Sequence, residues 1–155
     1  MPFTVMRASS ADAHEIAQLL RRSIVELCTS DHGNDPDRIQ PWLSRKTAES
    51  IETWIDGPGG TFVAQDHDKK ILGFGMGSPQ GHVLLNYVLP EARFTGVSKA
   101  LMRAVEDYFR DRGLDEVHLK STSTAEGFYR GLGYTETGES DTDLDMTFRG
   151  FKKAI

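Results

Sequence analysis

The feature of this sequence that most constrains its fold is the succession of strand and helix patterns between residues 60 and 121. Three β-prone segments, residues 61–65, 71–77 and 82–89, are separated by short polar turns, which predicts an antiparallel meander. An amphipathic helix follows over about residues 96–112, closed by Gly113, and leads to a further strand at 116–120. A helix between two strands of one sheet implies a right-handed crossover, so the class is mixed α/β.

The flanking segments complete this architecture. Residues 3–6 predict a strand and residues 8–27 a helix that Ser9 or Ser10 can cap. Residues 37–55 predict a helical region in two pieces, because Pro41 suits a helix start better than an interior. A short helix at 124–132, a strand start at 134–138 and a final strand at 144–151 follow. We therefore expect one domain over residues 1–155, with a mixed central sheet of about six to seven strands flanked by helices.

Composition limits the partners of the chain. The net charge is −5 and no basic, aromatic-rich patch is present, which argues against binding to nucleic acid. One cysteine excludes an internal disulfide, and no targeting or membrane-spanning pattern is apparent, so we expect a soluble cytoplasmic protein without membrane contact. The five histidines are scattered without ligand spacing, so we expect no metal. A homodimer is left open beside a monomer.

The start of the helix near residue 96 carries chemistry of its own. The first N–H groups of a helix lack internal acceptors and carry partial positive charge, so they can approach a phosphate. Gly96 removes bulk there, Ser98 adds a hydroxyl donor, and Arg93 and Lys99 add charge at the rim. Neither a Walker A loop nor a dinucleotide fingerprint is present. By itself, the stretch is equally compatible with an ordinary capped helix.

Two linked motifs decide between these alternatives. "YVLPEARFTGVSKALM" and "STSTAEGFYRGLGY" occur in the order and separation found in the GNAT superfamily of acyltransferases, which the chain resembles over essentially its whole length. The resemblance implies that acetyl-CoA is the co-substrate and that its pyrophosphate lies at the helix start. It implies the following acetyl-CoA contacts: Asn86, Tyr87, Val88, Arg93, Phe94, Thr95, Gly96, Val97, Ser98, Lys99, Ser121, Thr124 and Phe128.

The resemblance also implies a catalytic role for Tyr129, as the general acid that protonates the departing thiolate. From composition alone, a buried aromatic is the alternative. The first motif has Thr95 and Ser98 where relatives often have Gly or Ala, and hydroxyl residues replace a frequent Asn in the second motif.

The general base is not evident. The strand at 82–89 offers no carboxylate where many relatives have a Glu. His82 at its start could serve directly or through water, and it could equally be an ordinary residue at a strand end. Deprotonation of the amine through a water chain, with no dedicated base, is a third possibility.

The acidic segment after the first helix is the candidate acceptor site. Residues 28–42 contain Asp31, Asp35 and Asp37, together with His32, Trp42 and too many turn residues to be helical throughout. This content predicts an active-site loop that favours a cationic amine, with Asp31, His32 and Trp42 at the acceptor. A solvated connector without a substrate role is the alternative. Cys28 and His32 also form an i,i+4 pair that could act as nucleophile and base, although acyl transfer in this family is direct.

The sequence thus predicts an N-acetyltransferase that transfers an acetyl group from acetyl-CoA to a primary amine, by direct attack in a ternary complex. The acceptor would be a small molecule or an exposed amino group. A non-catalytic GNAT-fold module that binds or senses acyl-CoA is the alternative. The unusual first motif and the missing strand carboxylate keep this alternative open.

Overall fold

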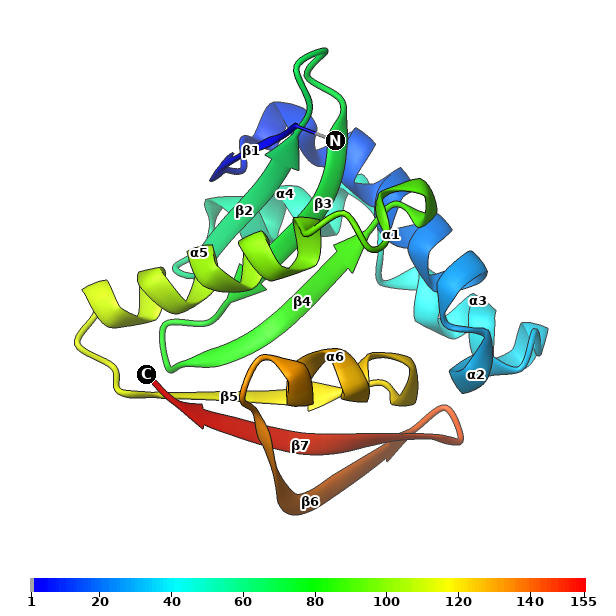
Figure 1. Ribbon diagram of the computed structural model, residues 1–155. Coiled ribbons are helices and arrows are strands. Elements are labelled where there is room, and N and C mark those ends of the chain that lie inside the picture. The colour runs from blue at the N-terminus through cyan, green and yellow to red at the C-terminus, as the bar shows by residue number, and fades with distance from the viewer. Residues whose placement is uncertain (1) are drawn as a thin grey trace.

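The computed structural model describes residues 2–155, and one seven-stranded sheet runs through it (Figure 1). The strand order is β1-β2-β3-β4-β5-β7-β6, and every neighbouring pair is antiparallel except β4 and β5. The strands are β1 (Thr4–Arg7), β2 (Gly60–Gln65), β3 (Ile71–Gly77), β4 (His82–Val88), β5 (Glu116–Ser121), β6 (Thr135–Asp143) and β7 (Met146–Ala154). The predicted α/β class, the meander and the crossover onto a parallel strand are confirmed.

The helices cover both faces of the sheet. In Figure 1, α5 and α6 lie in front of the strands, and α1 and α4 lie behind them. The α-helices are α1 (Ala13–Leu27), α2 (Thr29–His32), α3 (Pro36–Ser44), α4 (Ala48–Asp56), α5 (Val97–Asp111) and α6 (Glu126–Gly131). Three 3-10 turns join them, η1 (Ser10–Asp12), η2 (Pro90–Ala92) and η3 (Ser123–Ala125). No helix among residues 2–155 is long and apolar enough to cross a membrane.

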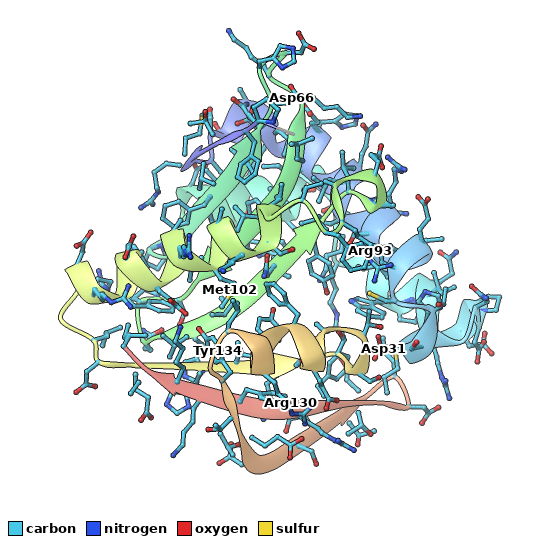
Figure 2. The ribbon with its side chains drawn as sticks, in the orientation of Figure 1. Asp31, Asp66, Arg93, Met102, Arg130 and Tyr134 are labelled. Carbon is cyan, nitrogen blue, oxygen red and sulfur yellow. The ribbon has the colours of Figure 1, made fainter. Side chains whose placement is uncertain are left out.

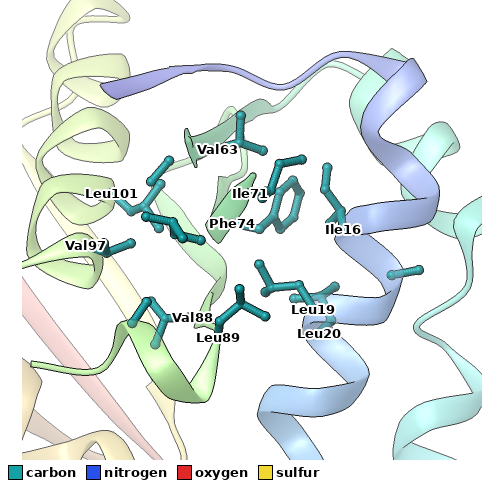
Figure 3. Packing of buried hydrophobic residues seen from close by; sticks show 14 of the residues in the cluster. Ile16, Leu19, Leu20, Val63, Ile71, Phe74, Val88, Leu89, Val97 and Leu101 are labelled. Atoms are coloured by element: carbon teal, nitrogen blue, oxygen red, sulfur yellow. The ribbon is translucent and has the colours of Figure 1, made fainter. Parts of the chain in front are cut away.

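The main core lies between α1 and the first strands of the sheet. Figure 3 shows Ile16, Leu19 and Leu20 of α1 directed at Phe74 of β3, with Leu101 of α5 beyond the strands. These five side chains are at most 2% exposed. The i, i+3, i+4 spacing on α1 places its apolar stripe on the sheet, which is the spacing the sequence shows.

Glycines on β3 let α5 approach the other face. A Cβ at Gly73 would lie 2.8 Å from side-chain atoms of Val97 and Leu101, and one at Gly77 would lie 2.7 Å from the Phe109 ring. Alternate residues of a strand share a face, so the pattern "GFGMG" leaves the α5 side without side chains. This close contact fixes where α5 begins relative to the end of β4.

Three expectations about local structure are wrong. The segment after α1 is not a loop, because α2 forms there and only residues 33–35 separate it from α3. Pro36 occupies the first turn of α3, with the Asp35 side chain capping it, whereas Pro41 lies inside that helix. Leu144 is not in the last strand: Leu144 and Asp145 have φ of 53° and 60°, which makes them the tight turn between β6 and β7.

Candidate active site

Strands β4 and β5 separate after a short parallel contact, and this opening organises the site. Their register contains only His82 with His118 and Val83 with Leu119, among the residues described. In Figure 1 the two strands diverge toward the side where α2 lies. From Leu84 onward, the β4 main chain has no β5 partner on that edge. Free strand N–H and C=O groups there are available to a ligand.

The turn before α5 presents a second set of free main-chain groups. Gly96 is the N-cap of α5 with φ of 88°, and it contributes no side-chain cap. No atom lies within 4 Å of a Cβ built there, so the start of α5 is open. The N–H groups of Val97, Ser98 and Lys99 have no acceptor within the helix. Their partial positive charge favours an anion.

A cavity of about 240 Å³ connects these two features. The predicted residues that line it are Asn86, Tyr87, Val88, Arg93, Phe94, Gly96, Val97, Ser98, Lys99, Thr124, Phe128 and Tyr129. Two of the predicted acetyl-CoA contacts, Thr95 and Ser121, do not line this cavity. The Thr95 hydroxyl donates to the Ala92 carbonyl inside the turn, and Ser121 is 1% exposed and donates to the Thr122 carbonyl at 2.7 Å. Contact of all these residues with acetyl-CoA stays a prediction.

A smaller cavity of about 60 Å³ lies between the diverging strands. It is bordered by residues 83–87 of β4 and by Lys120 and Ser121 of β5. The two cavities share five lining residues: Asn86, Tyr87, Thr122, Ala125 and Tyr129. No Asp, Glu or His lines either cavity in the part of the chain that the structure describes. His82, the candidate base, is exposed at the start of β4, with its ring 5.6 Å from that of His118.

Tyr129 stands where the two cavities meet. It is 7% exposed, and burial raises the pKa of its phenol to about 12, although the nearby Asn86 side chain opposes the shift. The phenol therefore keeps its proton at neutral pH. The Oδ1 atom of Asn86 is buried, and the described residues offer it no hydrogen-bond partner. A buried carbonyl oxygen without a partner is costly, so a ligand N–H at this position would be favourable.

The acidic segment is folded into contacts of its own. Asp31 is 8% exposed and accepts hydrogen bonds from Ser123 and Thr124. His32 is fully buried, with Nε2 2.9 Å from the Ile24 carbonyl oxygen and Nδ1 2.9 Å from the Asn34 nitrogen. Figure 2 places Asp31 close to the beginning of the α6 segment.

Trp42 is also buried, between the rings of His32 and Phe148. Asp31, His32 and Trp42 line neither of the two cavities described above, so their contact with an acceptor stays a prediction. The neighbouring Tyr87 phenol, which lines both cavities, has a pKa raised mainly by burial.

Sequence reasoning missed the contribution of α1 to the cavity. Ser23, Leu27 and Cys28 line it beside the predicted residues. Burial raises the pKa of the Cys28 thiol to about 12, and the nearby Asp31 carboxylate raises it further than Arg93 lowers it. A thiol with such a pKa is a poor nucleophile at neutral pH, so the structure does not support the Cys28–His32 pair as reacting groups. Nothing in the apolar periodicity of α1 marks which residues face a ligand.

Comparisons with known proteins agree with this architecture. The family model described as "Acetyltransferase (GNAT) domain" matches residues 29–153. The chain therefore belongs to the GNAT acetyltransferase family.

Curated relatives have related sequences over part of their length. The mycothiol acetyltransferase of Arthrobacter sp. (strain FB24) is 37% identical over 100 residues, which is 57% of this chain and 31% of that protein. The mycothiol acetyltransferase of Stackebrandtia nassauensis is 32% identical over 123 residues, which is 72% of this chain and 40% of that protein. The chain thus spans between about a third and two fifths of the length of these relatives.

Solved structures share the fold over their full length. A GCN5-related N-acetyltransferase from Rhodopseudomonas palustris superposes with a TM-score of 0.88 at 18% identity, covering 100% of this chain and 97% of that one. The PaiA N-acetyltransferase from Thermoplasma acidophilum, in complex with coenzyme A, superposes with a TM-score of 0.80 at 18% identity, covering all of both chains. At 18% identity, these superpositions show a shared fold alone.

Proposed function

We propose that this chain transfers the acetyl group of acetyl-CoA to a primary amine by direct attack in a ternary complex. The observation that carries the proposal is the meeting of two cavities at Tyr129 and Asn86. The larger cavity begins at the start of α5, and the smaller one opens between β4 and β5. Two substrates held at one point need no covalent enzyme intermediate, and holding them in attack geometry accounts for much of the rate.

The larger cavity fits the acetyl-CoA that the family implies. Its entrance combines the free N–H groups at the start of α5 with Arg93 and Lys99, which suits a pyrophosphate. The free edge of β4 and the unpartnered Asn86 oxygen suit the amides of the pantetheine arm. When bound, acetyl-CoA would supply an activated thioester.

The residues of the chain perform the remaining tasks. Main-chain N–H groups on the free edge of β4 are the donors available to polarise a carbonyl oxygen held beside them. Tyr129 holds a proton at its phenolic oxygen and donates it, as a hydrogen bond or by transfer, to a thiolate that develops nearby. Since no carboxylate or imidazole among residues 2–155 lines either cavity, we propose that the amine loses its proton to water.

A turnover assay tests this function. The wild-type protein is mixed with acetyl-CoA and a panel of primary amines, thiol release is followed, and products are identified by mass spectrometry. The proposal predicts amine-dependent thiol release with an N-acetylated product. Tight acetyl-CoA binding without release on any amine would instead support the acyl-CoA-binding module.

A further inference from the structure

The Asp31 carboxylate joins α2 to the segment that follows β5. One oxygen, Oδ1, accepts from the Ser123 main-chain nitrogen at 2.8 Å and from the Ser123 hydroxyl at 2.6 Å. The other, Oδ2, accepts from the Thr124 hydroxyl at 2.6 Å. All three contacts connect residues more than 90 positions apart in the chain. Because Asp31 is 8% exposed, solvent screens these charge-assisted bonds only weakly.

This carboxylate acts as the cap of a helix to which it does not belong. η3 and α6 form the helical stretch 123–131, and its own N-cap residue, Thr122, makes no side-chain cap hydrogen bond. Asp31 satisfies the first free N–H of the stretch, that of Ser123, and places a negative charge at its positive end. Tyr129 lies on the same stretch. Asp31 thereby fixes the start of the helix that holds the tyrosine where the cavities meet.

The same contact fixes the hydrogen-bonding polarity of Thr124. A threonine hydroxyl has one proton and two lone pairs, and it can rotate to donate or to accept. In this protein the proton is directed to Asp31 Oδ2, while Thr124 also lines the larger cavity. The hydroxyl oxygen is therefore available to a ligand only as an acceptor. The ligand group that it matches is an N–H donor, such as an amide of the pantetheine arm.

We propose that Asp31 is a positioning residue that caps the Tyr129 helix from α2 and orients the Thr124 hydroxyl to accept an amide N–H of acetyl-CoA. The ligand half of this proposal rests on the proposed function, whereas the capping half concerns the free protein. Asp31 thus has a role other than contact with a cationic amine. Both of its oxygens accept hydrogen bonds from Ser123 and Thr124, on the cofactor side of the site.

Amide hydrogen exchange tests the cap without any ligand. Asp31→Ala removes both acceptor oxygens, so neither Ser123 nor Thr124 keeps its partner. We expect peptides covering residues 123–131 to exchange at least several-fold faster than in the wild-type protein. Asp68→Ala is the matched control, since Asp68 is an exposed residue of the β2–β3 hairpin, and it should leave these peptides unchanged. Unchanged exchange in Asp31→Ala would overturn the cap, whatever the protein binds.

A double-mutant cycle in acetyl-CoA affinity, measured by calorimetry, tests the orientation of Thr124. Asp31→Ala and Thr124→Val should each weaken binding by about 10-fold, the value of one hydrogen bond to a matched acceptor. The double variant should be no weaker than either single variant, because both act on one contact. Thr124→Ser keeps the hydroxyl and should bind within about 2-fold of the wild-type protein.

The outcomes separate the two proposals. Losses that multiply to about 100-fold in the double variant would show that Asp31 and Thr124 act independently, and would overturn the orientation of the hydroxyl. Normal binding by Thr124→Val would overturn it too, and this variant retains Asp31 in case Asp31→Ala is too unstable to study. If the wild-type protein itself fails to bind acetyl-CoA, the proposed function fails together with the ligand half, and the exchange experiment alone decides the cap.

Discussion

The turn before α5 and the short helix α2 both carry polar groups that the sequence marks as candidates for binding. They differ in what those groups contact. At the start of α5 the N–H groups are free, and space is open around Gly96. In α2, Asp31 and His32 are buried and hydrogen-bonded within the protein. A main-chain N–H at the start of a helix remains free to bind a ligand because the helix contains no acceptor for it. A polar side chain remains free only where the tertiary structure provides it with no hydrogen-bond partner.

The largest effect is expected at the start of α5, where the main-chain N–H groups are free. Gly96→Asp adds a negative charge where the anion would lie, with no neighbouring atoms to shield it, and should abolish acetyl-CoA binding. Gly138→Asp is the matched control, because Gly138 also has positive φ (86°) and open surroundings but lies in the β6–β7 hairpin. Calorimetry should find normal affinity in the control. Equal binding by both variants would remove the anion site from the start of α5.

The second prediction tests the buried region at α2 through Cys28, the residue that directly precedes this helix. A pKa raised from 9.0 to about 12 lowers the thiolate fraction near pH 8 by a factor on the order of 10³. Alkylation by iodoacetamide should therefore be slower in the folded protein than in denaturant by at least that factor, since burial also limits access. Mass spectrometry over time measures both rates. Rapid labelling of the folded protein would return Cys28 to the candidate reactive groups.

Tyr129→Phe tests whether the tyrosine between the cavities acts chemically. Removing only the phenolic proton should lower kcat by about 10²-fold and leave acetyl-CoA affinity nearly unchanged. Tyr108→Phe, which loses only a hydrogen bond to the Pro58 carbonyl, is the control and should keep normal kcat. Wild-type turnover by Tyr129→Phe would mean that this ring only packs.

The pH dependence of the activity is a second test of Tyr129 as the acid. Because burial raises the Tyr129 pKa to about 12, the phenol stays protonated throughout the working range. The described residues place no carboxylate or imidazole in the two cavities. Activity should therefore rise with pH as the free amine deprotonates and should show no falling limb up to about pH 10. Steady-state rates in overlapping buffers measure this. A falling limb between pH 8 and 10 would mean that the essential acid is more acidic than Tyr129 is in this structure.

The smallest effect is expected at Glu91, which holds the turn before α5 to α1. Arg22 binds both carboxylate oxygens, at 3.0 and 3.1 Å, and lowers the Glu91 pKa to about 2. The contribution to stability is therefore full above the ordinary pKa of 4.5 and is lost as pH falls toward 2. Since the pair is exposed, Glu91→Gln should lower Tm by only about 2 °C at pH 7 and less at pH 3. An equal loss at both pH values would contradict the ion pair as its cause.

The same difference between local and tertiary contacts explains which parts of the fold could be predicted from the sequence. The meander, the crossover and the start of α5 depend on local periodicity and on main-chain geometry, and the structure confirms them. The α2 segment could not be predicted in the same way. Asp35 and Pro36 form a better helix start than Pro41, and the burial of His32 depends on Ile24 and Trp42, which no local pattern places together.

The residues of the candidate site also divide into those that a local motif places and those that only tertiary packing places. Residues of the two motifs surround one cavity because a single strand–turn–helix unit and α6 carry them. Ser23 and Leu27 were missed because their place on the cavity wall depends on how α1 packs across the sheet. The role of Asp31 was missed because its partners, Ser123 and Thr124, are more than 90 residues away.

An amide NMR titration with coenzyme A tests the central claim most directly. The wild-type protein is labelled with ¹⁵N, and ligand is added stepwise while each amide signal is followed. The account predicts saturable shifts concentrated at residues 86–88, at residues 94–99 and in α6, with little change at the β2–β3 hairpin tip. Saturable shifts centred elsewhere, or none at all at millimolar ligand, would contradict it.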